Sequence, residues 1–323
     1  MLCVIWGVLC FLYKRSRSIN LSLNQPNFLP VVRFCRLVCI SVLLLLQFVV
    51  PFGWADTQFP SLRQRFDPEL QRGLERVLDG LELTDAVRQK QLCVALVDIS
   101  DLEKPRVAAV NGDHMVYAAS LPKIAILLGA FKLIESGEMA WDEPTRRTLT
   151  DMIRSSSNRA ASEMLQRIGP SRLAEILQSP EYGFYDPQFN GGLWVGKSYG
   201  KSGLWKRDPL HNLSHGATAM QAARFYYLLE TNRLVNPPLT EKMKGILSEP
   251  AINHKFVKGL AAAPDVNIYR KSGTWKQWHA DSVLVEYGGY RYIAVGLVHH
   301  PDGGKWLEQL IAPLHHLIVK DPG

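Results

Sequence analysis

The sequence predicts an α/β fold of the α+β type, in which both ends of the chain contribute strands to one antiparallel sheet with flanking helices. Apolar and β-branched residues mark candidate strands at 92–100, 106–112, 266–272, 281–287 and 291–298. The segment between the second and third of these strands has apolar residues at helical spacing instead. The economical arrangement is a sheet built from the two ends, with an all-α subdomain inserted between them.

Local signals support the elements in order along the chain. Asp67 and Pro68 have the residue types of an N-cap and a first helical position, ahead of an apolar stripe. Further helices are expected at 121–136, 144–155, 159–168, 171–178, 217–231, 239–248 and 306–319. The residues Tyr-Gly-Gly-Tyr at 287–290 predict a hairpin between the last two strands. Residues 180–216 show neither helical nor strand periodicity, and a loop of this length in a compact domain is usually functional or mobile.

The basic residues of the chain indicate export rather than nucleic-acid binding. The formal net charge is +7, but residues 1–55 contain five of the 37 basic side chains and none of the 30 acidic ones. The remainder is close to neutral, so no nucleic-acid partner is expected. Two arginines precede the apolar run 37–50, and the small residues Gly53 and Ala55 follow it. This order is typical of a secretory signal cut after Ala55, which predicts a secreted or periplasmic protein.

The alternative for this segment is an uncleaved membrane anchor. The apolar run is shorter than the ~20 residues that cross a bilayer, so no stable membrane span is expected in the mature form. The predicted organisation is an N-terminal extension and signal peptide, 1–55, and one domain, 56–323. Within that domain, the expected α/β part comprises 56–119 and 253–323, and the helical part 120–252. Cys93 is then the only cysteine of the mature chain, and it is interpreted as a small core residue of a buried strand.

A serine and a lysine open the first helix of the helical part, in Ser120-Leu-Pro-Lys123. Residues three apart on a helix share a face, and Pro122 suits the first turn because its missing N–H would have no partner there. A lysine among apolar residues tends to lose its proton, and the neutral amine can then deprotonate the serine to make a nucleophile. Free N–H groups at the helix start suit a developing oxyanion. The alternative is a capping serine beside a lysine that extends to solvent.

A second motif, Ser156-Ser157-Asn158, lies at a break between two expected helices. Its functional interpretation is a hydroxyl that relays a proton to the leaving amine and a carboxamide that holds a substrate amide. The alternative is ordinary helix capping, since serine and asparagine are common cap residues.

A third motif, Lys271-Ser272-Gly273-Thr274, is expected at the end of a strand, before a turn into the next one. It offers a cation and a hydroxyl for a substrate carboxylate, a glycine for close backbone approach, and the Thr274 N–H as an oxyanion donor. The alternative is a turn with a solvated lysine. Lys201-Ser202-Gly203 repeats the tripeptide, but it lies in the glycine-rich loop before a helix, and we interpret it as a decoy.

The three motifs, in this order, resemble the signature of the penicillin-recognising serine enzymes, namely β-lactamases and penicillin-binding D-Ala-D-Ala peptidases. Residues 64–323 are most similar to class A β-lactamases, which implies a β-lactamase/transpeptidase-like fold. The resemblance implies that Ser120 is acylated, that Lys123 is its base and that Ser156 shuttles the proton. It implies substrate-binding roles for Asn158, Lys271, Ser272, Gly273 and Thr274. The backbone N–H groups of Ser120 and Thr274 would form the oxyanion hole, and neither metal nor cofactor is expected.

The sequence departs from the class A pattern at points that affect mechanism. Ser157 stands where class A enzymes have an aspartate, and Asp281 lies in a region where the family often has a carboxylate-binding arginine. Residues 182–217 contain no glutamate, although class A enzymes use a glutamate of this loop to hydrolyse the acyl-enzyme. The remaining candidates for such a base are Asp186, Asp208, His211 and His215.

The function expected from the sequence is that of an exported serine hydrolase that opens a β-lactam or a related amide or ester, with slow deacylation. The substrate is expected to be a small molecule or a peptidoglycan peptide. One alternative is a periplasmic D-Ala-D-Ala peptidase, that is, a penicillin-binding protein. Another, from a different class, is a non-catalytic wall-binding module on the same scaffold.

Overall fold

The structure, a computed structural model, describes residues 59–200, 203, 205–263 and 265–319. The predicted signal segment, 1–55, and its cleavage site lie outside the described residues. Within the described part, no helix combines the length and the apolar character needed to cross a membrane.

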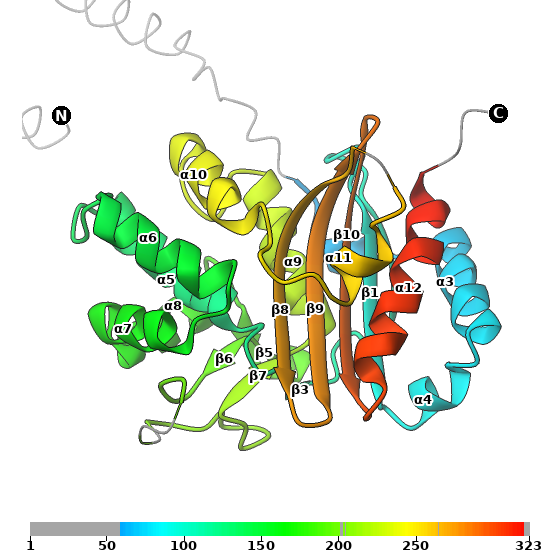
Figure 1. Cartoon of the computed structure of the whole chain (residues 1–323), viewed down its shortest axis with the longest axis horizontal. Helices are drawn as coiled ribbons and strands as arrows, with labels where there is room; N and C mark the ends of the chain where they lie inside the picture. The colour runs from blue at the N-terminus through cyan, green and yellow to red at the C-terminus, as the bar shows by residue number, and fades with distance from the viewer. Residues whose placement is uncertain (1–58, 201–202, 204, 264, 320–323) are drawn as a thin grey trace, which may run out of the picture. The chain divides into compact units, whose positions relative to one another are not determined.

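A five-stranded antiparallel sheet lies at the centre of the fold, in the strand order β2-β1-β10-β9-β8 (Figure 1). Its strands are β1 (Leu92–Asp98), β2 (Arg106–Val110), β8 (Asn267–Trp275), β9 (Trp278–Tyr287) and β10 (Tyr290–His299). Strands from the two ends of the chain meet where β1 pairs with β10, with Leu92 opposite Val298. This topology confirms the predicted fold class.

The last two strands form the predicted hairpin. Tyr287 and Tyr290 face each other in the register, and Gly288 and Gly289 between them have φ values of 54° and 87°. These left-handed conformations favour glycine, and they belong to a tight turn whose twist matches that of the flanking strands. The pair of glycines in the sequence therefore has a direct structural reason.

The end of β8 differs from the expectation. The strand continues to Trp275, which pairs with Trp278 across the turn, so the third motif lies within the strand rather than at its end. Pairing with β9 extends the strand through Gly273 and Thr274, two residues whose types carry little strand signal of their own. Because β8 is the last strand in the order, the motif lies on an edge strand of the sheet.

Helices cover both faces of the sheet (Figure 1). Alternate residues of β1 enter two separate cores, Leu92, Val94 and Leu96 in one and Cys93, Ala95 and Val97 in the other. The first core is closed by α3 (Pro68–Gly80) and α12 (Gly303–Ile318), the second by α9 (Ala219–Glu230) and the other helices of the helical part. As predicted, Asp67 caps α3 by accepting a hydrogen bond from the Leu70 N–H at 2.7 Å.

Cys93 is fully buried in the second core, and burial raises the pKa of its thiol to about 12. The thiol therefore stays protonated at neutral pH, as expected of a core residue rather than of a nucleophile.

The helical part contains the expected helices, with bounds that differ by at most two residues from those predicted. They are α5 (Lys123–Glu135), α6 (Glu143–Ile153), α7 (Asn158–Ile168), α8 (Pro170–Gln178), α9 and α10 (Pro237–Leu247). Across the whole described chain there are also shorter helices, namely η1 (Leu62–Gln64), α4 (Thr84–Arg88), η2 (Pro187–Phe189) and α11 (Phe256–Gly259).

The stretch 180–216 contains short strands that its sequence did not reveal. β6 (Trp194–Val195) and β3 (Val116–Tyr117) pair on either side of β7 (His215–Ala217). β4 (Tyr185–Asp186) pairs with β5 (Gly191–Gly192). Two or three residues are too few to show a period of two, so these strands depend on contacts distant in sequence.

Candidate active site

Ser120 lies in the turn that leads into α5. Its backbone carbonyl accepts a hydrogen bond from the Lys123 N–H at 3.2 Å, and Ala119 before it has a left-handed φ of 50°. α5 begins at Lys123 with Pro122 at its N-cap, and no side chain caps this end. The Ser120 hydroxyl is therefore not used as a helix cap, and the residue is half-buried at the start of a helix.

Lys123 is fully buried on the first turn of α5. Its Nζ donates hydrogen bonds to the Ser156 carbonyl oxygen at 2.6 Å, to Asn158 Oδ1 at 2.9 Å and to Ser156 Oγ at 3.4 Å. Burial lowers the pKa of the amine to about 7. The side chain therefore does not extend to solvent, and it is held ready to lose a proton near neutral pH.

These hydrogen bonds join the first two predicted motifs. Among the described residues, the side-chain amine of Lys123 is hydrogen-bonded to the second motif and not to the Ser120 hydroxyl. Transfer of the Ser120 proton to Lys123 thus needs a small side-chain movement or an intervening water molecule, as is common in active sites without substrate.

The second motif lies at the connection between α6 and α7, and each of its three residues makes different contacts. Ser157 is the N-cap of α7, with its Oγ accepting from the Ala160 N–H at 3.2 Å. Ser156 has a left-handed φ of 58° and directs its hydroxyl to the two lysines of the site. The Oδ1 atom of the exposed Asn158 accepts from Lys123, and within the described part of the chain its amide N–H groups have no partner and can meet a ligand. Capping therefore explains only the middle residue.

Lys271 approaches the same hydroxyl from β8. Its Nζ donates to Ser156 Oγ at 3.0 Å and to the Ser272 carbonyl oxygen at 2.8 Å. Only 1% of the residue is exposed, and burial, with the charge of Lys123 next in importance, lowers the pKa of the Lys271 amine well below its usual value. Lys271 is thus not the solvated lysine of a turn. The Ser156 hydroxyl lies between two buried amines.

Gly273 brings β8 against the turn that holds Ser120. A Cβ atom on Gly273 would lie 2.3 Å from the Ala118 carbonyl oxygen and 2.7 Å from the Ser120 nitrogen. Real side chains do not approach so closely, so this position requires glycine. The buried Ser272 precedes it and the exposed Thr274 follows it, at the edge of the sheet beside Ser120. The three sequence motifs therefore meet at one place.

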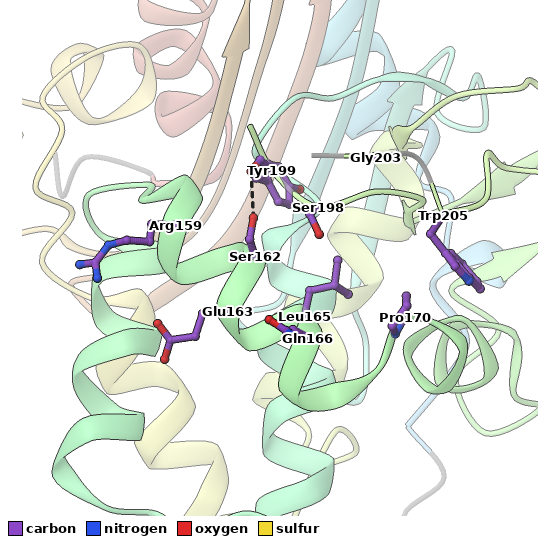
Figure 2. A pocket seen from close by; sticks show the side chains of 10 residues that line it. All are labelled: Arg159, Ser162, Glu163, Leu165, Gln166, Pro170, Ser198, Tyr199, Gly203 and Trp205. Carbon is purple, nitrogen blue, oxygen red and sulfur yellow. Dashed lines mark hydrogen bonds between the residues drawn. The ribbon is translucent and has the colours of Figure 1, made fainter. Parts of the chain in front are cut away.

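Tyr199 is a residue of the site that the sequence did not single out. Its ring lies over Lys123, with Nζ 4.6 Å from the ring centroid, and its hydroxyl donates to the Ala119 carbonyl oxygen at 3.4 Å. Its own carbonyl accepts from Ser162 of α7 at 2.8 Å (Figure 2). Tyr199 thus shields Lys123 from water. The only sequence signal was its place in the irregular stretch 180–216.

An open groove of about 850 Å³ adjoins Tyr199. It lies between α7 and the residues around Tyr199 and Trp205, and Figure 2 shows charged and polar side chains of α7 beside it, among them Arg159, Ser162 and Glu163. Tyr199 is the residue that the groove shares with the site, since neither Ser120 nor Lys123 lines it. Of the repeated tripeptide, Lys201 and Ser202 lie outside the described residues, and its interpretation as a decoy stays a prediction.

The candidate bases of the loop have other tasks. The buried Asp208 accepts hydrogen bonds from the Tyr185 hydroxyl and from the backbone N–H groups of Leu210, His211 and Leu213. His215 is only 3% exposed, and burial lowers the pKa of its ring to about 4. Asp208 therefore organises the loop, and His215 is a neutral ring in the wall of the site.

The two remaining candidates also have structural partners. Asp186 caps η2 by accepting from the Gln188 N–H at 2.9 Å. His211 Nε2 lies 3.1 Å from the Asn190 carbonyl oxygen on the exposed side of the loop. Neither contact involves Ser120 or Lys123.

Asp281, noted in place of an arginine, forms a buried ion pair with Arg270. Arg270 Nη2 lies 2.7 Å from Asp281 Oδ2, and the two side chains are 2% and 0% exposed. The carboxylate is therefore neutralised inside the protein and does not face the site. The arginine of the pair lies on β8, directly before Lys271.

The fold and the three converging motifs define a protein of the β-lactamase-like class, with a serine and two buried lysines at the junction of sheet and helical part. The chain belongs to the beta-lactamase enzyme family, whose family model matches residues 82–148 and 144–320. None of the curated proteins matches the chain by sequence.

Solved structures with the same fold include PBP-A, with a TM-score of 0.58 and 18% identity over 78% of this chain and 96% of that one. A β-lactamase from Sphaerobacter thermophilus has a TM-score of 0.59 and 14% identity, covering 76% and 96%. A class A β-lactamase from Bacteroides cellulosilyticus has a TM-score of 0.60 and 14% identity, covering 77% and 97%.

Proposed function

We propose that the chain is an exported serine hydrolase that opens a β-lactam or a related amide or ester through an acyl-serine intermediate. The observation that carries the proposal is the Ser156 hydroxyl, within hydrogen-bond distance of both Lys123 and Lys271 beside the turn of Ser120. Membership of the beta-lactamase enzyme family supports it, as does a relative of the same fold, a variant of PBP-A described as an acyl-enzyme complex with penicillin G.

Acylation begins when neutral Lys123 takes the proton of the Ser120 hydroxyl and Oγ attacks the substrate carbonyl carbon. A serine hydroxyl is a weak nucleophile until a base removes its proton, and the lowered pKa of Lys123 keeps part of the amine neutral at pH 7. The developing oxyanion receives hydrogen bonds from the backbone N–H groups of Ser120 and Thr274.

The tetrahedral species collapses when the carbon–nitrogen bond breaks. The proton that left Ser120 passes from Lys123 through the Ser156 hydroxyl to the leaving nitrogen, so no proton is gained or lost. Lys271 holds the Ser156 hydroxyl in place and, with Ser272, faces the carboxylate of the substrate. The products of this step are an acyl ester on Ser120 and a free amine on the opened substrate.

Hydrolysis of the ester needs a water molecule and a base to take its proton. The loop residues that were candidates for this base have other roles. Asp208 accepts four hydrogen bonds from within the loop and its neighbour Tyr185, and His215 is buried. Lys123 is then the group left to act as base a second time. We propose that this step is slower than acylation.

The engagement of the loop carboxylates and histidines elsewhere also favours a second candidate function, a D-Ala-D-Ala peptidase. An enzyme without a dedicated water-activating base forms an acyl-serine readily but releases it slowly, and the open groove beside Tyr199 leaves room for a peptide substrate. A non-catalytic wall-binding module is the alternative of another class, and it predicts an unreactive Ser120.

The test is the intact mass of the protein after incubation with benzylpenicillin. We expect one covalent adduct, mapped to the peptide that contains Ser120 and absent in Ser120→Ala. Ser155→Ala is the matched control, because the exposed Ser155 hydroxyl donates to the Asp151 carbonyl oxygen and contacts none of the three motifs' side chains in the described part of the chain. An adduct that survives Ser120→Ala would contradict the assignment, and no adduct on the wild type would favour the non-catalytic module.

Turnover separates the two catalytic candidates. Release of D-alanine from a D-alanyl-D-alanine peptide, faster than any β-lactam is hydrolysed, would favour the peptidase. Export is tested separately: N-terminal sequencing of the secreted protein should give Asp56, and a mature chain that still begins at Met1 would contradict the signal peptide.

A further inference from the structure

Lys255 is a buried lysine outside the predicted motifs. It lies directly before α11, with 2% of its surface exposed and a left-handed backbone φ of 52°. Such a conformation is unfavourable for a residue with a side chain and persists only where the surrounding structure imposes it. A buried charge on an unfavourable backbone indicates that the ammonium has a specific task.

The ammonium of Lys255 contacts the third motif directly. Nζ donates to the Gly273 carbonyl oxygen at 2.6 Å, to Thr274 Oγ1 at 2.9 Å and to the Ala280 carbonyl oxygen at 3.0 Å. An ammonium has three donors, so each is used. Gly273 and Ala280 are opposite each other in the register of β8 and β9. Lys255 therefore holds both strands where β8 passes Ser120.

The buried pair Arg270–Asp281 fixes the segment that carries Lys255. Arg270 donates to the carbonyl oxygens of Ile252 at 2.8 Å and His254 at 3.2 Å. Asp281 Oδ2 accepts from the Phe256 N–H at 3.2 Å. The residues on both sides of Lys255 are therefore bound to β8 and β9, which leaves the ammonium little freedom to move away.

The contact to Gly273 bears on the next peptide bond. A peptide unit is planar and trans, so the carbonyl oxygen of Gly273 and the N–H of Thr274 point in opposite directions. Lys255 occupies the carbonyl side. The side of Gly273 that would carry a Cβ faces the turn of Ser120, at 2.7 Å from the Ser120 nitrogen. Fixing the carbonyl therefore also fixes the direction of the Thr274 N–H.

We infer that Lys255 is a positioning residue that orients and polarises the Gly273–Thr274 peptide, so that the Thr274 N–H donates more strongly to the oxyanion of the acylation step. A positive charge on the carbonyl oxygen draws electrons from the amide nitrogen, and hydrogen bonds in such a chain strengthen one another. The inference rests on the proposed function, because it assumes an oxyanion beside Ser120. Lys255 acts through the peptide and does not touch the substrate.

The charge state suits this role at neutral pH. Burial lowers the pKa of Lys255 to about 8, and the charge of Asp281 raises it while that of Arg270 lowers it. The ammonium is therefore mostly protonated at pH 7. Two histidines nearby have lowered pKa values, His254 at about 4 by burial and His279 below its usual value, also by burial. The pKa of the Lys271 amine lies well below its usual value as well.

The kinetic test compares Lys255→Met with Lys258→Met. Lys258 lies on α11, is 57% exposed and pairs with Glu308 at 2.7 Å, so it is a matched control with no contact to the third motif. Stopped-flow acylation by a chromogenic cephalosporin separates the binding constant from the acylation rate constant. Loss of a whole oxyanion donor lowers kcat by about 10²–10³-fold, so we expect about 10–10²-fold for a weakened one, with binding unchanged. Equal acylation rates in the two variants would overturn the inference.

A spectroscopic test separates polarisation from a purely structural role. Stronger hydrogen bonds lower the carbonyl stretching frequency of the acyl ester, so rapid-mixing infrared spectra with benzylpenicillin should show a higher frequency in Lys255→Met than in wild type and Lys258→Met. If Lys255→Met does not fold, the wild type alone decides. Its ester frequency should rise between pH 7.5 and 9.5 as Lys255 loses its charge, and an unchanged frequency would overturn the inference. A wild type that forms no acyl-enzyme would instead contradict the proposed function.

Discussion

Lys271 donates a hydrogen bond to the hydroxyl of Ser156 at 3.0 Å, although the two residues are 115 positions apart in the chain. The contact joins the edge strand of the sheet to the start of α7. Lys123 reaches the same hydroxyl from α5 at 3.4 Å. A proton on any of these three groups can therefore move along one short path between sheet and helical part.

Replacement of Ser156 tests this path. Ser156→Ala should lower the acylation rate constant for a chromogenic cephalosporin by about 10²–10³-fold, because one positioned proton-transfer group contributes about 10²–10⁴-fold. Ser157→Ala is the matched control: it removes only the cap of α7 and should cost about 1 kcal/mol of stability while leaving acylation unchanged. Similar acylation losses in both variants would contradict a special role for Ser156.

The pH dependence of acylation should follow Lys123. Its pKa is lowered from 10.5 to about 7, so the neutral amine, which can accept the Ser120 proton, predominates above that pH. The second-order constant of acylation, which is the acylation rate constant divided by the dissociation constant of the substrate, should rise about tenfold per pH unit below pH 7. Above pH 7 it should level off. A series from pH 5 to 8 measures this. Lys123→Met should abolish the rise, and a flat profile in the wild type would contradict Lys123 as base.

Glycine at 273 should be essential for the shape of the site rather than for folding. In Gly273→Ala the new Cβ would lie 2.3 Å from the Ala118 carbonyl oxygen, so β8 and the turn of Ser120 must separate. We expect adduct formation with benzylpenicillin to fall by at least about 10²-fold, the size seen when one oxyanion donor is lost. The control is Gly245→Ala in α10, where a Cβ meets nothing within 4 Å and alanine should stabilise the helix by about 0.5–1 kcal/mol. Full labelling of Gly273→Ala would refute the close approach.

The sequence was sufficient for those features that depend on local chemistry. Asp67 before Pro68 indicated a helix start, and Gly288-Gly289 indicated a tight hairpin, because capping and left-handed turns restrict residue type at the position itself. Three short motifs in order predicted residues that the structure brings together from α5, the α6–α7 connection and β8.

Features that depend on contacts distant in sequence were not predictable. β8 extends through Thr274 because β9 pairs with it, and the short strands of 180–216 are set by each other. His215 is buried by packing that no local pattern shows. Tyr199 and Lys255 contact the site from segments without a motif, so only the folded chain identifies them. The sequence contained their residue types but no sign of their partners.

The fate of the acyl-enzyme is the sharpest test of the whole assignment. Asp208 already accepts hydrogen bonds from Tyr185 and three backbone N–H groups, so its use as a base for water would break the loop that it organises. Without a positioned base, attack on an acyl ester loses about 10²–10⁴-fold. We therefore expect acylation to outpace deacylation, so that the adduct accumulates during steady-state hydrolysis of penicillins.

Stopped-flow acylation and steady-state turnover, measured on one chromogenic β-lactam, decide the point. A burst of one equivalent followed by slow turnover is the expected result. Asp208→Asn should then destabilise the protein, because a neutral amide cannot accept the same four hydrogen bonds, but it should leave the deacylation rate constant of the folded fraction unchanged. Turnover without a burst, together with its loss in Asp208→Asn at full folding, would show that Asp208 is the base after all.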